Sequence, residues 1–277
     1  MTTVHMYTGS EAGLSVNAYL VETPHGVVAV DATLTQSDSR ALRARADHLG
    51  KPLLAVLLTH GHPDHVAGVT NLVAGLDVPV VALASVRDLM ARTEAAKHAQ
   101  WAGMFGAEWI PAWTYPTQLV HDQEVLEFDG VTFRVHDLGA GGDCDANAIW
   151  VLESEQPPVA FVGDLLFNGY HTYMADGAVL RWRANLTQFR PLLAGMARLY
   201  VGHGPAGDAR LVDQQLAYFD HYCAALLEIT RGGGQLDEAA TAELTARLTR
   251  AYPDYGLQFM VGLSAPRVAV ELAAVAP

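Results

Sequence analysis

Three histidines and one aspartate fall within six consecutive positions, in the segment Thr59-His60-Gly61-His62-Pro63-Asp64-His65. Imidazole and carboxylate groups together are ligands for zinc, iron or manganese. Because side chains alternate along an extended chain, His60 and His62 can face one ion. Asp64 and His65 follow where the chain turns into a predicted helix, so they point toward a second position nearby. The segment therefore predicts a metal site, against the alternative of a polar loop with chance histidines.

A metal site of this kind predicts hydrolytic chemistry. A divalent ion lowers the pKa of bound water toward neutrality and polarises a carbonyl or phosphoryl oxygen. Asp64 is the catalytic candidate, either as a ligand or as a general base. We therefore expect metal-assisted hydrolysis through a metal-bound hydroxide.

The elements around this segment must place it at the end of a strand. Leu53 to Leu58 is a continuous apolar run, typical of a strand buried on both faces. Further strands are predicted at 15–21, 27–30, 78–83, 118–120, 125–128, 131–135, 149–153 and 159–162, with Asp129-Gly130 as a hairpin turn. Helices are predicted at 37–49, 66–76, 85–99, 182–193, 208–231 and 257–275, and Ser85 is the predicted N-cap of the third. A break at Gly232–Gly234 is followed by more helix to 250. This order predicts an α/β chain, built as two sheets with outer helices or as a doubly wound sheet.

The motif His60-Gly61-His62-Pro63-Asp64-His65 resembles the HxHxDH signature of the metallo-β-lactamase superfamily. The order of elements is similar to that family along most of the chain. Two later segments also match: Phe161-Val162-Gly163-Asp164 and Val201-Gly202-His203-Gly204-Pro205. The resemblance implies an αββα sandwich of two mixed β-sheets flanked by helices, with a helical C-terminal extension.

The resemblance also implies which residues hold metal. His60 and His62 would bind a first ion, and Asp64, His65 and His203 a second. Asp164 would touch both ions. The expected cofactor is Zn²⁺, as one or two ions, with iron or manganese as alternatives.

The chain departs from the family pattern at one ligand. The family's usual histidine, in a Gly-His-Thr loop between the two motifs, falls at Gly142 here. Asp143, Cys144 and Asp145 are candidate replacements, and Asp143 is the nearest carboxylate. The alternatives are a weak or empty first site, with both aspartates serving only as turn residues. We therefore predict that the first site binds metal more weakly than the second.

Candidate substrate contacts lie in two further segments. The segment near 100–117 is dense in aromatic residues and has no clean period: Trp101, Phe105, Trp109, Trp113 and Tyr115. It is interpreted either as an exposed lid or homodimer contact, with Trp109 binding substrate, or as a satellite core. His171 and Tyr173, in the loop after the Asp164 strand, are the other candidates.

Composition narrows the classes of partner. The chain has 277 residues, 51% of them apolar, and a formal net charge of −13. We expect one domain over 1–277, with an aromatic insertion near 100–117 and a helical part at 208–277. Such an acidic chain repels nucleic acids and anionic membranes, so a small-molecule substrate is expected. Neither a secretion signal nor an apolar span is visible, which favours a cytoplasmic protein.

Our first hypothesis is a hydrolase of an ester, lactone or thioester bond in a small apolar or acyl substrate. The missing GxSxG elbow argues against a serine hydrolase. One alternative is a di-iron or persulfide-oxidising protein on the same scaffold, which bound, coloured iron would favour. Another is a degenerate, metal-poor binding module, motivated by Gly142.

Overall fold

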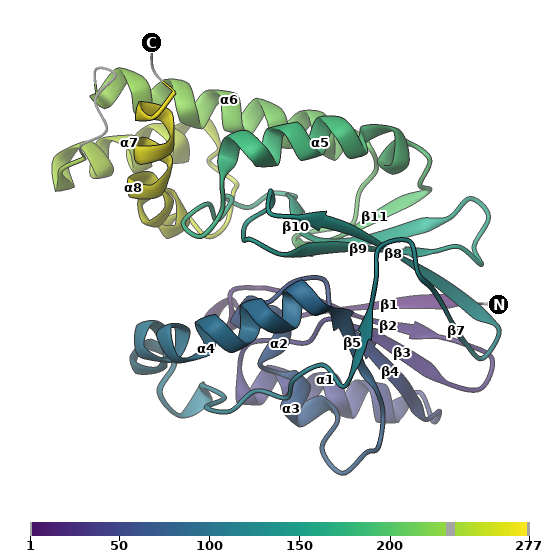
Figure 1. Cartoon of the computed structure of the whole chain (residues 1–277). Helices are drawn as coiled ribbons and strands as arrows, with labels where there is room; N and C mark the ends of the chain where they lie inside the picture. The colour runs from purple at the N-terminus through teal and green to yellow at the C-terminus, as the bar shows by residue number, and fades with distance from the viewer. Residues whose placement is uncertain (1, 231–235, 276–277) are drawn as a thin grey trace.

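The computed structural model describes residues 2–230 and 236–275. Two β-sheets face each other, and helices lie on the outer side of each (Figure 1). This is the αββα sandwich of mixed sheets that the resemblance implied, and the doubly wound alternative is wrong.

The first sheet carries the strand that precedes the histidine motif. Its order is β1-β2-β3-β4-β5-β6, namely Thr3–Thr8, Asn17–Glu22, Val27–Val30, Leu53–Leu57, Val80–Leu83 and Gln118–Val120. Strands β1 to β3 are antiparallel, whereas β3 to β6 are parallel. The helices on this side are α1 (Gln36–His48), α2 (Pro63–Val66), α3 (Val69–Leu72) and α4 (Ala84–Phe105). The parallel strands place their carboxyl ends at one edge, where ligands of open α/β sheets usually bind.

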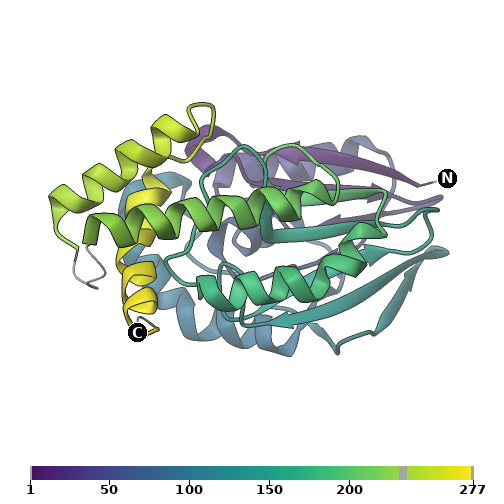
Figure 2. The ribbon, with the colours of Figure 1, turned by 90° about the horizontal axis from the view of Figure 1, so that it is seen from above.

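The second sheet carries the other two matched motifs. Its order is β11-β10-β9-β8-β7, namely Arg198–His203, Val159–Phe167, Asn147–Leu152, Val131–Gly139 and Val125–Phe128. β10 and β11 are parallel, and the other pairs are antiparallel. The helices α5 (Val179–Ala194) and α6 (Arg210–Thr230) lie over its outer side, while α7 (Glu238–Ala251) and α8 (Phe259–Ala273) pack with α6 beyond one end of the sheet (Figures 1 and 2).

Alternation along β9 shows how the second sheet joins two cores. Trp150 and Leu152 belong to the hydrophobic cluster between the sheets, whereas Ile149 and Val151 belong to the cluster beneath α5, α6 and α8. Successive side chains of a strand point to opposite faces, so β9 is buried on both. The indole of Trp150 donates a hydrogen bond of 2.9 Å to the Leu58 carbonyl, directly before the motif loop. The second sheet therefore fixes the position of that loop.

Several elements differ from the sequence-based predictions. The helix expected at 66–76 is two short helices, α2 and α3, because the Gly68 N–H donates to the Thr33 carbonyl at 2.7 Å instead of continuing the helical hydrogen bonds. The predicted N-cap Ser85 lies inside α4, which begins at Ala84. That helix also continues through Phe105, past the expected end at 99. The strand β1 was not predicted, and the Gly232–Gly234 break lies outside the described residues.

The C-terminal helices share a core with the second sheet. Buried residues of α6 and α8, including Phe219 and Val268, belong to the same cluster as Ile149 of β9. We therefore propose that the helical C-terminal part folds with the rest of the chain as one domain. Among the described residues, no helix is both long and apolar enough to cross a membrane.

Candidate metal centre

The motif loop connects β4 to α2 at the carboxyl edge of the first sheet. Pro63 occupies the first turn of α2, and His62 is the residue that precedes it. Proline suits this position because its missing N–H has no partner in a helix's first turn. The loop thus ends at a fixed helix start, with Asp64 and His65 on the first turn.

Asp64, His65, Asp164 and His203 form the larger of two His/Asp groups, and we call them the second cluster. Their candidate ligand atoms all lie within 4.8 Å of one another. His203 Nε2 lies 3.3 Å from Asp64 Oδ2 and 3.4 Å from Asp164 Oδ2. His65 Nε2 lies 3.3 Å from Asp164 Oδ1. The structure thus brings together every residue that the resemblance assigned to the second ion.

His60, His62 and Asp143 form a smaller group beside it, the first cluster. Asp143 Oδ2 lies 2.5 Å from His62 Nδ1 and 3.2 Å from His60 Nε2. The ring centroids of His60 and His65 are 4.1 Å apart, so the two clusters adjoin. Asp143, the nearest carboxylate to the missing histidine, lies where a third ligand is needed; that it binds metal stays a prediction.

The donors fit a divalent cation. Within the described residues, His60 Nε2, His65 Nε2, both Asp143 oxygens and Asp164 Oδ1 are buried and make no hydrogen bond. Buried polar atoms are normally satisfied, so such a concentration calls for a partner. Two imidazoles with one carboxylate, and two imidazoles with two carboxylates, are donor sets typical of zinc, iron or manganese.

Buried partners orient the histidines of the second cluster. His65 Nδ1 lies 2.8 Å from Asp31 Oδ2, and His203 Nδ1 donates to the Leu14 carbonyl at 3.0 Å. A carbonyl only accepts, so His203 carries its proton on Nδ1 and turns Nε2 toward the carboxylates. Thr59 donates its hydroxyl to Asp31 at 2.6 Å and lies 3.1 Å from His60 Nδ1. Asp31 therefore supports both clusters.

A separate network supports His62 from the cavity side. Asp176 Oδ2 lies 3.2 Å from His62 Nε2 and accepts the Tyr173 hydroxyl at 2.8 Å. The same oxygen pairs with the ammonium of Lys97, a 7% exposed residue on α4. A proton held on His62 Nε2 leaves Nδ1 free to bind a cation.

Neighbouring charges shift the pKa values of these groups. Burial lowers the pKa of His62, but the Asp143 and Asp176 carboxylates outweigh it and raise this pKa to about 10. At His203, burial again lowers the pKa, but the Asp164 and Asp64 carboxylates outweigh it and raise this pKa to about 9. Burial raises the pKa of Asp64, but His65 and His203 lower it to about 2. Protons and metal ions therefore compete for these nitrogens.

The loop that carries Asp143 has no room for a histidine one residue earlier. A Cβ at Gly142 would lie 2.8 Å from three side-chain atoms of Asn147. Burial raises the pKa of the Cys144 thiol well above its usual range, so it stays protonated. Asp145 pairs with Arg92 at 2.9 Å on the surface. Neither of these two residues belongs to the first cluster.

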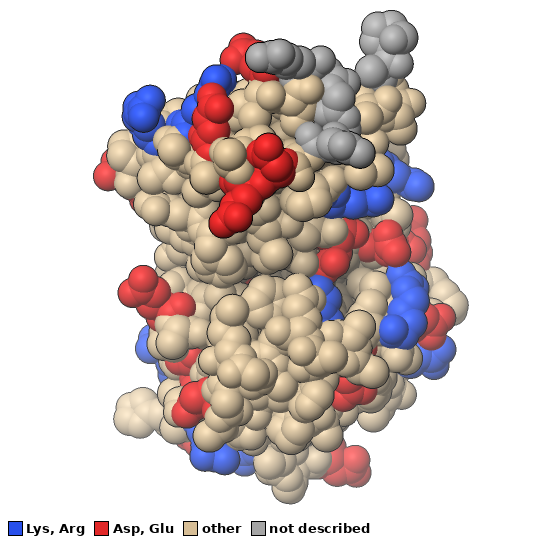
Figure 3. All heavy atoms as spheres, turned by 90° about the vertical axis from the view of Figure 1, so that its left-hand side faces the viewer, with Lys and Arg blue, Asp and Glu red and all other residues tan. Residues whose placement is uncertain are grey.

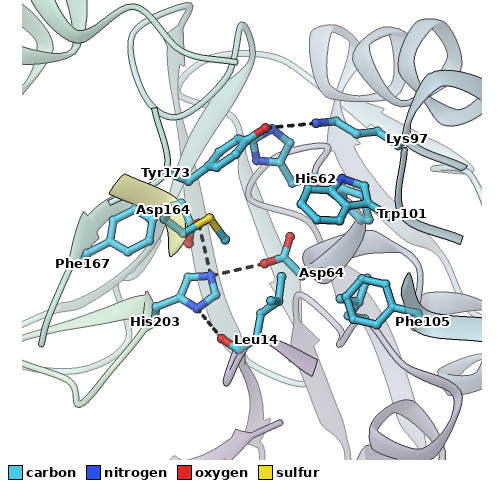
Figure 4. Close-up of a pocket in the computed structure, with 13 residues that line it drawn as sticks. Leu14, His62, Asp64, Lys97, Trp101, Phe105, Asp164, Phe167, Tyr173 and His203 are labelled. Carbon is cyan, nitrogen blue, oxygen red and sulfur yellow. Dashed lines mark hydrogen bonds and ion pairs between the residues drawn. The ribbon is translucent and has the colours of Figure 1, made fainter. Parts of the chain in front are cut away.

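A cavity opens directly beside the clusters (Figure 4). His62, Asp64, Asp164 and His203 are in its wall, together with Lys97 and Tyr173. The remaining wall is mainly apolar: Leu14, Leu34, Pro63, Trp101, Phe105, Phe167 and Met260. Trp101 and Phe105 are four residues apart on α4, so they share one helix face, which is turned to the cavity.

Two of the predicted substrate contacts lie elsewhere. Trp109 is 5% exposed within the inter-sheet core, and its indole donates to His98 Nδ1 at 2.8 Å. His171 is completely buried, with its Nδ1 3.0 Å from the Tyr218 hydroxyl, and burial lowers its pKa to about 4. The aromatic segment therefore divides: Trp101 and Phe105 line the cavity, whereas Trp109 and Trp113 are core.

Sequence reasoning missed Asp31, Lys97 and Asp176 as site residues. Asp31 follows β3 directly, and a carboxylate at the carboxyl end of a parallel strand was a usable signal. Lys97 and Asp176 are 79 residues apart and come from α4 and the loop after β10. No local pattern could have paired them.

Comparison with known proteins gives the context of this geometry. The model of the metallo-beta-lactamase superfamily matches residues 12–203. Two proteins of Bacillus subtilis (strain 168) match in sequence. The uncharacterized protein YobT is 43% identical over 70 residues, 25% of this chain and 30% of that protein. The probable metallo-hydrolase YflN is 33% identical over 93 residues, 29% of this chain and 35% of that protein. The matched parts thus span about a third of each relative.

Solved structures share the fold at low sequence identity. A metallo-beta-lactamase family protein from Thermus thermophilus superposes with a TM-score of 0.71 at 23% identity, covering 97% of this chain and 92% of that one. A metallo-beta-lactamase from Pontibacter korlensis gives 0.61 at 20% identity, covering 79% and 94%. The part of this chain that matches the superfamily model ends at His203, before α6 to α8 begin.

Proposed function

Since this chain belongs to the metallo-beta-lactamase superfamily, we propose that it is a metal-dependent hydrolase of an ester, lactone or thioester bond in a small, mainly apolar molecule. One observation carries the proposal: two adjoining clusters of buried His and Asp donors lie at the wall of a cavity whose remaining lining is mostly apolar. The wall favours an apolar substrate, and the donors favour hydrolysis.

The ligands proposed for the ions are the residues of the two clusters. His60, His62 and Asp143 would hold one, and Asp64, His65, Asp164 and His203 the other. A divalent ion bound there supplies a water of lowered pKa and polarises the substrate carbonyl. Zinc suits both donor sets.

Asp64 is the residue best placed to handle a proton. It lines the cavity, and its pKa of about 2 keeps it ionised at neutral pH. One oxygen, Oδ2, faces His203 and His65 at 3.3 and 3.8 Å. We propose that the carboxylate either binds an ion or accepts a proton from a water molecule in the cavity.

Tyr173 and Lys97 shape the cavity rather than drive the reaction. The Tyr173 ring packs edge-on against His62 at 5.4 Å between centroids, and its hydroxyl is donated to Asp176. The Lys97 charge is likewise paired with Asp176. Substrate would therefore meet the Tyr173 ring as an apolar surface.

A second candidate function is favoured by the Asp143 carboxylate, which lies in place of the family's usual histidine. Asp143 makes the first cluster richer in oxygen donors, which shifts the preference from zinc toward iron or manganese. A di-iron or persulfide-oxidising protein is the corresponding alternative. The metal-poor alternative is disfavoured, because Asp143 lies in the gap left by Gly142.

The proposed partner is a small molecule. The net charge of −13 opposes nucleic acids and anionic membranes. The deciding experiment is metal analysis of purified protein, then a panel of esters, lactones and thioesters assayed with stripped and reconstituted protein. Colourless zinc with metal-dependent hydrolysis is expected. Coloured iron without hydrolysis would favour the oxidase alternative instead.

A further inference from the structure

A second hollow, which we call the outer groove, adjoins the cavity. The two share Leu14 and Phe105 in their walls. Further along, the outer groove is lined by Ala12, Met104 and Phe259. These residues come from three separate segments: the turn after β1, the end of α4 and the start of α8. The groove is therefore assembled only by the complete fold.

Two large apolar side chains of this groove are exposed. Met104 is 69% exposed and Phe259 is 46% exposed. Exposed apolar residues gathered along one hollow indicate a binding surface, whereas scattered ones do not. Here they continue the apolar wall that Phe105 and Trp101 form inside the cavity.

Helix α8 contributes to both compartments with successive residues. Met260 is 5% exposed and lines the cavity, while Phe259 lines the outer groove. Both residues lie beyond His203, where the superfamily model ends. The clusters and the groove thus come from different parts of the chain.

The charge of the groove restricts what can enter it. Its described lining includes Glu11 and Glu108 but no lysine or arginine. Both carboxylate oxygens of Glu108 accept hydrogen bonds of 2.8 Å from Ser37, from its backbone N–H and from its hydroxyl. Figure 3 shows the side of the molecule that lies to the left in Figure 1, toward which α4 runs, and uncharged side chains cover much of its middle. An anionic group would meet only repulsion here.

We propose that the outer groove binds the distal apolar chain of the substrate, whose scissile carbonyl lies at the clusters. This rests on the proposed function and narrows its substrate class. The substrate is an ester, lactone or thioester with an unbranched apolar chain long enough to pass Phe105, and its far end carries no negative charge. Thioesters on a phosphate-bearing carrier placed in this groove are disfavoured.

The kinetic test compares the wild type with two groove variants across acetate, butyrate, hexanoate, octanoate and decanoate esters of one alcohol. In the wild type, kcat/KM should rise with chain length, by at most about fourfold per buried methylene. Ala12→Trp fills the groove and Met104→Glu places a charge in it. Each should lower the decanoate-to-acetate ratio at least about tenfold. Ala242→Trp, an exposed alanine on helix α7 that lines neither the cavity nor the outer groove, is the matched control and should keep the wild-type ratio.

A binding arm separates this inference from the proposed function. Amides with the same alkyl chains resist hydrolysis, and their affinity can be measured by calorimetry. Chain-dependent affinity that both groove variants abolish would support the groove even if no ester were cleaved. Cleavage of short esters would overturn the proposal for the groove if neither ester cleavage nor amide binding depended on chain length. The proposed hydrolase function would then stand. Concentration-dependent dimerisation that Met104→Glu abolishes, without chain-dependent binding, would assign this surface to a second copy of the chain instead.

Discussion

The two ligand clusters adjoin, yet they are held in different ways. In the second cluster, the outer nitrogens of His65 and His203 bond to the buried Asp31 side chain and to a backbone carbonyl. In the first cluster, the outer nitrogen of His62 faces Asp176, whose side chain is 37% exposed. The third candidate ligand, Asp143, comes from a Gly-rich loop between β8 and β9. The difference shows that ligand identity alone does not define a metal site.

This comparison gives an order of metal binding. The second cluster offers four donors on the strands β10 and β11 and on a helix start, with buried support. The first offers three: His60 shares the Asp31 support through Thr59, but His62 depends on the Asp176–Lys97 pair, which joins α4 to the loop after β10. A preformed donor set loses less entropy on binding, so the second cluster should load first.

The largest effect should follow removal of Asp164, which faces both histidines of the second cluster. Asp164→Ala should lower metal content and reduce turnover at least about a hundredfold, since loss of even a supporting partner usually costs 10–100-fold. Metal analysis and hydrolysis rates check this, with thermal unfolding to confirm folding. Asp164→Asn keeps the shape without the charge. Wild-type metal content in both variants would remove Asp164 from the site.

Asp143→Ala tests whether the first cluster is a real site. Stripped wild-type protein, titrated with zinc by calorimetry, should show a tighter step followed by a weaker one. The variant should lose the weaker step and keep the tighter one, because Asp143 contacts His60 and His62 and is not a member of the second cluster. Two equal, tight steps that survive the substitution would make Asp143 a turn residue.

Asp176→Asn should have a smaller, selective effect. It weakens the acceptor that orients His62, so first-site affinity should fall about tenfold, at the low end for second-layer partners. The second site should be unchanged in the same titration. Asp145→Asn, which removes the surface pair with Arg92 near Asp143, is the matched control. Equal weakening of both sites by Asp176→Asn would mean that Asp176 supports the fold generally.

The smallest expected effect is a dependence of the Tm of the metal-stripped protein on pH. The folded-state pKa values of His62 and His203, about 10 and about 9, lie above the ordinary 6.5. Their stabilising contribution is therefore complete below pH 6.5 and is lost as the pH rises toward 10. The Tm of stripped protein should fall over this interval, by about 2–4 °C for each kcal/mol lost. Metal-loaded protein should show a smaller fall, because the ion replaces the protons. Parallel Tm curves would contradict this competition.

The sequence was informative where chemistry is local. Three histidines and an aspartate within one loop, Asp164 at a strand, and His203 at a strand end needed only short segments and a family resemblance. The alternation of strands and helices left a doubly wound sheet open as well, and the family resemblance pointed to the αββα sandwich. Even Asp143 could be proposed, because it follows Gly142 directly.

The remainder depended on packing between distant segments. The Lys97–Asp176 pair and the contact of Asp31 with His65 join residues far apart in the chain. Trp109 was misassigned because composition does not reveal which side of a segment is buried. The four-residue spacing of Trp101 and Phe105 was a helical signal, but the aromatic density around it obscured the period.

The crowding around Gly142 has a consequence for how such a site can change. A histidine there would need the space that Asn147 occupies, and Asn147 Nδ2 also donates to the Cys144 carbonyl at 2.8 Å within the same loop. Gly142→His alone should therefore disrupt the loop before it could add a ligand. The step becomes accessible only after Asn147 is replaced by a smaller residue, so the order of the two substitutions matters. At position 142, the change from glycine to histidine is therefore closed as a single step.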